Sequence, residues 1–118
     1  MDTKEMIDAA ARAMFKTVEV DIGKTKARLR ELSKTEMDAL DKINFKQKPD
    51  GSGPVEDANG KLTIIDVMKY YDNWIAATIE PKFTAEEVKD WPFSLKKELL
   101  EKAKKINGIE PADTTAKN

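Results

Sequence analysis

The chain has 118 residues, of which 40% are hydrophobic and 36% are charged, and its formal net charge is −1. This size suits one domain, and a nearly neutral chain has no long-range attraction toward nucleic acid phosphates. Cysteine and histidine are absent, which excludes disulfides, thiol nucleophiles, thiolate metal sites and histidine-based catalysis. No apolar run reaches the about 20 residues that cross a bilayer, and the charged N-terminus is unlike a secretory leader. We therefore expect an intracellular protein.

The first predicted element is a helix over residues 2–15. Its apolar side chains recur at helical spacing and are Met6, Ile7, Ala10 and Met14. The apolar face is narrow, so we expect this helix to need a partner surface to stay folded.

A β-hairpin is predicted over residues 17–30. Residues 17–22 and 25–30 each alternate in polarity with the period of a strand, and Gly23-Lys24 supplies the turn. The side chains expected to face the helices are Val18, Val20, Ile22, Ala27 and Leu29. Two strands alone are marginal in water, so the hairpin has to pack on the helical part.

A second helix begins after Ser33, which forms a capping box with Glu36, and runs to about Phe45. Its apolar residues are Met37, Leu40 and Ile43. Residues 46–60 then lose all periodicity and collect Pro, Gly and Ser, which predicts a mobile loop.

The strongest helix signal covers residues 62–80. A continuous stripe predicted to face the core consists of Ile64, Met68, Tyr71, Ile75 and Ile79, widened by Tyr70 and Trp74. Pro81 ends the helix, because proline disfavours a helical residue before it.

Two short elements complete the chain. Thr84 with Glu87 is another capping box and opens a helix that stops at Trp91-Pro92. Ser94 can cap the last helix, whose predicted buried face is Leu95, Leu99, Ala103 and Ile106. Gly108 stands where a left-handed cap belongs.

The predicted class is therefore α+β, mostly α, with a short N-terminal β-hairpin packed on about four helices. Residues 1–108 form one domain, and residues 109–118 form a flexible tail.

A calcium loop can be aligned to residues 55–66. Suitable positions are held by Asp57, Asn59, Gly60, Leu62 and Asp66, but the first ligand position holds Val55, which has no side-chain oxygen. Asn-Gly before a helix is ordinary turn chemistry, so we favour a turn and predict no metal site.

Basic residues follow one face of the second strand, at Lys26, Arg28 and Arg30. Glu19 and Asp21 are expected opposite them, which favours cross-strand ion pairs over phosphate binding. The lysine clusters Lys96-Lys97 and Lys102 to Lys105 alternate with glutamates and are interpreted as a solvated helix face. We predict no nucleic acid partner.

Most of the aromatic surface falls in one stretch, at Tyr70, Tyr71, Trp74, Trp91 and Phe93. Aromatics at helical spacing usually belong to a core, but one or two of these are expected to be exposed for a protein partner. No phosphate-binding loop, dinucleotide fingerprint or nucleophile elbow is present, and paired carboxylates such as Glu86-Glu87 lie on amphipathic helices without an evident pocket. We predict no catalytic residue and no cofactor.

With this organisation the chain resembles the tail assembly chaperones of long-tailed bacteriophages and their prophages, over about residues 17–111. The segments that carry the resemblance are Thr17-Val18-Glu19-Val20-Asp21-Ile22-Gly23, Ala27-Arg28-Leu29-Arg30-Glu31-Leu32-Ser33, Trp91-Pro92-Phe93-Ser94-Leu95-Lys96-Lys97-Glu98-Leu99-Leu100 and Ile106-Asn107-Gly108. The acidic stretch common in the middle of such proteins is reduced here to Glu56-Asp57.

The resemblance implies a non-enzymatic protein in the bacterial cytoplasm. Such proteins bind the tape measure protein, help recruit tail tube subunits, self-associate, and leave before the virion matures. They often exist in a short form and a frameshifted longer form. Two alternatives stay open: a small helical adaptor or regulator with another protein partner, and a calcium- or nucleic-acid-binding module.

Overall fold

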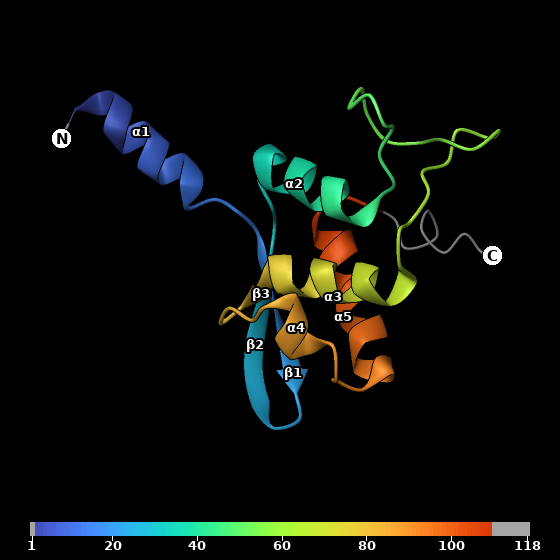
Figure 1. The fold of residues 1–118 in the computed structure, drawn as a ribbon. Helices are drawn as coiled ribbons and strands as arrows, with labels where there is room; N and C mark the ends of the chain where they lie inside the picture. The colour runs from blue at the N-terminus through green and yellow to red at the C-terminus, as the bar shows by residue number, and fades with distance from the viewer. Residues whose placement is uncertain (1, 110–118) are drawn as a thin grey trace.

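A computed structural model describes residues 2–109 of the chain, and within them it contains five helices and one three-stranded sheet. The elements in chain order are α1 (Thr3–Arg12), β1 (Thr17–Ile22), β2 (Thr25–Arg30), α2 (Lys34–Asn44), α3 (Val67–Thr78), β3 (Ile79–Glu80), α4 (Ala85–Val88) and α5 (Phe93–Ile106). Helices α2 to α5 gather beside the sheet, whereas α1 stands away from the body (Figure 1). The predicted α+β, mostly α class is confirmed. The tail expected over residues 109–118 lies outside the described residues except for Ile109.

The N-terminal hairpin forms as predicted. Its strands are antiparallel in the register Val20↔Ala27 and Asp21↔Lys26, and Gly23 adopts the left-handed φ of 64° that the tight turn requires. The side chains of Val20, Ala27 and Leu29 are buried against the helices, and the hairpin thereby gains the support that two strands need.

A third strand, β3, was not predicted. Ile79 pairs with Leu29 of β2, so the central helix ends at Thr78 and not at Glu80. Two features explain the difference. Pro81 disfavours a helical Glu80, and Ile79 buries its β-branched side chain in the sheet.

The same helix also begins later than predicted, at Val67 instead of Leu62. Asp66 is the N-cap, and its carboxylate accepts a hydrogen bond from the Lys69 N–H at 3.1 Å. The preceding backbone is used elsewhere, because the Ile65 N–H donates to the Asn44 carbonyl at 2.9 Å.

The buried face of α3 agrees with the predicted stripe in part. Tyr70, Trp74 and Ile75 are buried as predicted, whereas Met68 is exposed and the polar Asp72 and Thr78 are buried as well. In α2 the predicted core residue Leu40 is buried, but Ile43 near the helix end is exposed.

The segment between α2 and α3 contains no helix or extended strand, as predicted for residues 46–60. It is closed by isolated antiparallel bridges at Phe45↔Ile64, Gln47↔Pro54 and Glu56↔Leu62. Backbone hydrogen bonds join Lys46 to Thr63 at 2.7 Å and Asp57 to Lys61 at 2.8 Å. The mobility of this segment stays a prediction.

Local sequence signals set the starts of α2 and α4 and the end of α5 as predicted, with one exception at the start of α5. Capping boxes at Ser33/Glu36 and Thr84/Glu87 are present as predicted. The exception is α5, which begins directly after Pro92 and not after a capping Ser94. Its other end closes on Gly108, with φ of 80°, whose N–H donates to the Lys105 carbonyl at 3.0 Å.

The core contains two lysines of α5, which corrects the interpretation of all these lysines as a solvated face. Lys96 and Lys104 lie four residues before and four residues after the buried Leu100, so they share its helix face, next to the predicted buried row. The Lys96 ammonium lies 2.8 Å from Asp72 Oδ1 of α3 and donates to the Lys89 carbonyl. The approach to Asp72 makes an ion pair but lacks hydrogen-bond geometry, so within the described residues Asp72 Oδ1 has no hydrogen-bond partner.

Candidate functional site

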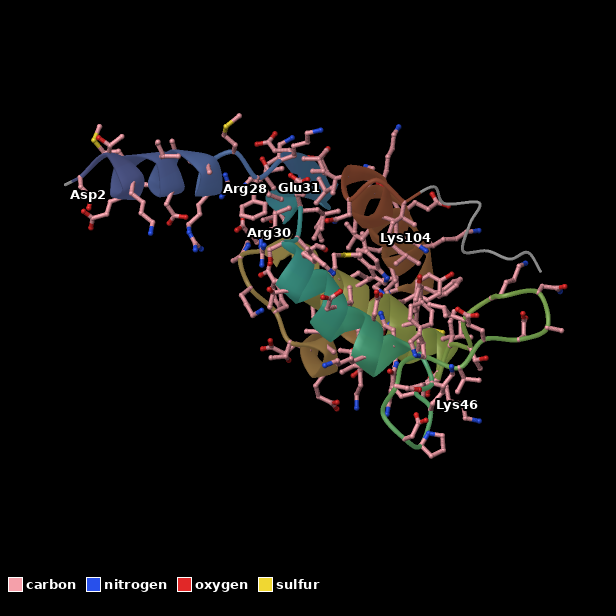
Figure 2. All side chains as sticks on the ribbon, turned by 90° about the horizontal axis from the view of Figure 1, so that it is seen from above. Asp2, Arg28, Arg30, Glu31, Lys46 and Lys104 are labelled. Carbon is pink, nitrogen blue, oxygen red and sulfur yellow. The ribbon has the colours of Figure 1, made fainter. Side chains whose placement is uncertain are left out.

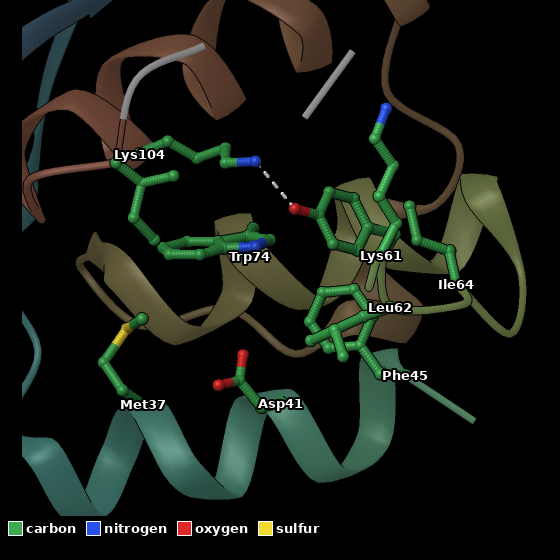
Figure 3. A pocket seen from close by; sticks show the side chains of 10 residues that line it. Met37, Asp41, Phe45, Lys61, Leu62, Ile64, Trp74 and Lys104 are labelled. Carbon is green, nitrogen blue, oxygen red and sulfur yellow. Dashed lines mark hydrogen bonds between the residues drawn. The ribbon is translucent and has the colours of Figure 1, made fainter. Parts of the chain in front are cut away.

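A pocket of about 390 Å³ opens between α2, α3 and the end of α5 (Figure 3). Seven of its lining residues are apolar or aromatic: Met37, Phe45, Leu62, Ile64, Tyr70, Trp74 and Ile109. The other three are the charged residues Asp41, Lys61 and Lys104. A concave, largely apolar lining with a few polar groups is typical of a binding site.

Helical spacing places the two main walls. Met37, Asp41 and Phe45 follow one another at steps of four on α2, so they line one face. Tyr70 and Trp74 are one turn apart on α3 and form the facing wall. The bridge between Phe45 and Ile64 brings the segment before α3 over the pocket edge.

Lys104 and Tyr70 form the buried polar corner of the pocket. Lys104 Nζ donates to the Tyr70 hydroxyl at 2.8 Å and lies 5.2 Å from the centre of the Tyr70 ring. Burial raises the pKa of Tyr70 to about 12. Tyr70 therefore keeps its proton at neutral pH and serves as a hydrogen-bonding partner rather than a base.

Among the described residues that line the pocket, Asp41 supplies the only carboxylate. Figure 3 shows its carboxylate directed from α2 toward Trp74. Burial, and secondarily the charge of Asp38, raise the pKa of Asp41 above its ordinary value. A carboxylate in partly apolar surroundings can orient a bound partner through one hydrogen bond or one opposite charge.

A row of four aromatic rings leads from the pocket to the surface. Phe45 and Tyr70 have ring centres 6.0 Å apart, Tyr70 and Tyr71 6.5 Å, and Tyr71 and Phe93 5.2 Å. The row begins in the pocket wall and ends at Phe93, which is 50% exposed. We call these four residues the aromatic row.

Further apolar side chains are exposed along the segment that enters α3. They are Leu62, Ile65, Val67 and Met68. Leu62 also lines the pocket, and Met68 precedes Tyr71 by three residues on the helix. Large apolar side chains exposed in sequence beside an apolar pocket are characteristic of a protein-binding surface.

The five aromatic candidates from the sequence have three different placements. Tyr70 and Trp74 are only 5% and 2% exposed, so they belong to the core and to the inner wall of the pocket. Tyr71 is half-buried and Phe93 is exposed, and both belong to the aromatic row. Trp91 instead packs on Phe83, with ring centres 5.1 Å apart.

The α2 wall was missed by sequence reasoning. From the sequence, Met37 is one of the apolar residues of the second helix, Asp41 has no distinguishing signal, and Phe45 marks only the expected helix end. Their common spacing of four was a signal for one shared face, but the residues opposite that face depend on the path of residues 46–66. That path has no periodic signal.

Ion pairs with acidic side chains neutralise the basic strand, as predicted, but Asp21 is joined by Glu80 and Glu36, which were not the predicted partners. Asp21 pairs with Lys26 at 2.7 Å across the hairpin, and Glu80 of β3 lies 3.2 Å from Arg28. Arg30 donates two hydrogen bonds to Glu36, at 2.9 and 2.6 Å. These hydrogen bonds are the main reason that the pKa of Glu36 is lowered to about 2.

The segment that aligns with a calcium loop forms a turn whose hydrogen bonds use the Asp57 carboxylate. One oxygen of Asp57 accepts hydrogen bonds from the backbone N–H groups of Asn59 and Lys61, at 2.8 and 2.9 Å. Those bonds lower the pKa of Asp57. Across residues 2–109, acidic side chains do not gather in groups that could hold a metal ion, and none of the helices is long and apolar enough to span a bilayer.

Comparison with known proteins adds no identification. The chain matches no protein-family model, and neither curated proteins nor solved structures give a significant match.

Proposed function

We propose that this protein is a non-enzymatic tail assembly chaperone of a long-tailed bacteriophage or prophage. In this proposal it binds the tape measure protein, helps recruit tail tube subunits, and acts in the bacterial cytoplasm before leaving the maturing virion. The observation that favours a binding role most is the aromatic row, which joins an apolar pocket to the exposed ring of Phe93.

The chemistry of the surface suits a helical client. An amphipathic helix binds by placing apolar anchors, spaced three or four residues apart, into an apolar groove. The pocket has room for one or two such side chains, and Phe93 with Met68 offers further contact outside it. Asp41 supplies a polar group that fixes orientation.

Weak contacts are sufficient for this role. A long client carries many similar sites, and copies that also contact one another gain avidity without strong individual binding. A weak contact also allows release when tube subunits replace the chaperone. Self-association is therefore part of the proposal.

The test is co-expression with the tape measure protein from the same gene cluster. We expect the tape measure protein to become soluble and to elute with this chain. Phe93→Asp should abolish the complex, whereas Lys97→Gln, which changes the net charge equally on an exposed position of the same helix, should retain it. The chaperone proposal fails if the tape measure protein is equally soluble without this chain and no complex elutes.

A helical adaptor for another client is the second candidate, because the same surface would serve it. The gene neighbourhood separates the two. A tail tube gene upstream and a tape measure gene downstream would favour the chaperone, and their absence would favour the adaptor.

A further inference from the structure

Helix α1 has no partner within the described residues. All residues of Thr3–Arg12 are exposed, and the helix extends from the sheet without packing on the body (Figures 1 and 2). Asp2 and Glu5 form a complete capping box at its start. Helices of about ten residues are marginal in water even with good caps, so lasting helicity requires tertiary burial.

One face of α1 has the composition of a buried face. Met6 and Ile7 are 57% and 64% exposed and share a face with Ala10 and Met14. The opposite face carries the ion pair between Asp8 and Arg12, at 2.9 Å. The helix is therefore amphipathic, with its apolar side directed into solvent.

A groove on the same chain has the complementary form. It has a volume of about 480 Å³ and lies between α2, α3 and the residues that lead into α4. Its lining includes four alanines, Ala39, Ala76, Ala77 and Ala85, with the larger Ile43 and Phe83. Small side chains allow a helix to approach closely, and Ile43 adds an exposed apolar side chain to the groove.

We propose that α1 of one copy docks into this groove of a second copy, and that the second α1 docks reciprocally to close a two-fold dimer. The inference deepens the self-association in the proposed function and rests on it. Its new content is the pair of surfaces that meet.

The short connection between α1 and β1 favours docking of α1 on a second copy over docking on its own chain. Lys16 is fixed to the sheet, because its N–H donates to Glu31 Oε1 at 3.0 Å and its carbonyl accepts from the Glu31 N–H at 2.8 Å. Figure 2 shows α1 leading away from the region of Glu31 and Arg30. The three residues between α1 and Lys16 give little freedom to reverse the helix, and short connections of this kind favour domain exchange.

The area also favours a reciprocal dimer. A helix of about 15–20 Å, burying one half of its surface, removes on the order of 600 Å² from solvent when both partners are counted. One such contact is below the size of a stable interface, whereas two give about 1,200 Å², the lower end of the specific range.

The net charge of residues 2–16 argues against a membrane surface as the partner of the apolar face of α1. Residues 2–16 contain three acids, Asp2, Glu5 and Asp8, and three bases, Lys4, Arg12 and Lys16, so the segment is neutral. Helices that lie on anionic membranes are usually strongly basic on the polar face. A neutral helix with mixed charges suits a protein groove whose lining carries charges of both signs, on Arg30, Glu36 and Lys82.

The test is the mass in solution by size exclusion with light scattering, from about 1 µM to about 1 mM, so that micromolar to millimolar dissociation constants are covered. We expect a concentration-dependent dimer. Ile7→Glu on α1 and Ala39→Glu in the groove should each raise the dissociation constant at least tenfold. Arg12→Gln and Thr35→Glu change the charge equally outside these surfaces and should leave it unchanged. All four positions are exposed, so folding should survive.

Three outcomes would overturn the inference. The first is a monomer throughout the range, including a monomer whose α1 amides are protected from exchange by docking within the chain. The second is a dimer unaffected by Ile7→Glu. The third is a dimer that responds to Ile7→Glu but not to Ala39→Glu, which places α1 on another surface. None of these outcomes alters binding of the tape measure protein through Phe93, so failure here is distinguishable from failure of the proposed function.

Discussion

Helix α1 has a more complete start signal than α3 or α5, yet α1 is exposed whereas the helix pair α3–α5 is packed in the core. Both α1 and α2 begin with complete capping boxes, whereas α5 begins without any side-chain cap. Yet α1 buries no residue, while Ile75 of α3 and Leu99 and Ala103 of α5 are at most 1% exposed. Caps decide where a helix begins, and tertiary burial decides how much it contributes to the free energy of unfolding.

The contact between α3 and α5, which we call the α3–α5 seam, contains a buried ion pair, whereas the ion pair of α1 is exposed to solvent. The ion pair of Asp72 with Lys96 is buried, whereas that of Asp8 with Arg12 is exposed. A buried pair loses hydration on both ions, so its net contribution to stability is small while removal of one partner is costly. The buried pair therefore fixes how α3 and α5 fit together more than it stabilises them.

The largest expected effect is in the core of α3. Trp74→Ala should lower the free energy of unfolding by about 3–5 kcal/mol, because the ring is buried and its removal leaves a cavity. Chemical denaturation measures the loss. Trp91→Ala is the matched control, and its half-buried ring against Phe83 should cost clearly less. Equal losses would contradict the placement of Trp74 in the core.

The buried ion pair gives the next effect. Asp72→Ala should lower stability by about 3 kcal/mol, because it leaves the Lys96 ammonium buried with only the Lys89 carbonyl. The double variant Asp72→Leu/Lys96→Met should recover most of the loss, since no unpaired charge remains. A double variant as unstable as Asp72→Ala would show that the seam depends on more than charge pairing.

Local chemistry explains how much of the fold was predictable. The hairpin, both body capping boxes and the turn at Gly108 follow from short-range patterns, and all are confirmed. The boundaries of α3 were wrong at both ends because the competing contacts are distant in sequence. Ile65 is held by Asn44, and Ile79 is held by Leu29.

The candidate site was predictable only in part. Tyr71 and Phe93 were singled out as aromatic, but their ring contact depends on how α5 crosses α3. Lys96 and Lys104 were assigned to solvent because lysine is rarely buried without a partner. Their partners, Asp72 and Tyr70, are on another helix, and one sequence does not reveal that pairing.

A smaller effect is expected from a comparison of the capping boxes of α2 and α1. The pKa of Glu36 is lowered from 4.5 to about 2, first by the hydrogen bonds from Arg30. Because the folded value is the lower one, the stabilisation is present above pH 4.5 and is lost as the pH falls toward 2. The pair is partly solvated, so we expect about 1 kcal/mol rather than the value that the full shift implies.

Glu36→Gln should therefore lose about 1 kcal/mol at neutral pH and show a weaker acid dependence than the parent chain. Glu5→Gln alters the equivalent capping residue of α1 and is the matched control. Its effect on global unfolding should be undetectable, because α1 buries nothing. Urea denaturation at several pH values measures both variants, and identical acid dependence in Glu36→Gln and the parent would refute the assignment.

The smallest effect is expected at α1 and at Met14, which follows its last turn. Met14 is 79% exposed, so Met14→Ala should change the free energy of unfolding by less than about 0.5 kcal/mol at protein concentrations below about 1 µM. Under the same conditions α1 amides should exchange with solvent almost without protection, while the Ile75 amide exchanges only on global unfolding.

Raising the protein concentration makes the comparison between α1 and the α3–α5 pair more decisive. If α1 exchanges between copies, its amides gain protection in the dimer, and Met14→Ala then weakens association while leaving the core amides unchanged. Strong protection of α1 at the lowest concentration would instead show that the helix packs within its own chain, and the contrast between α1 and the α3–α5 pair would disappear.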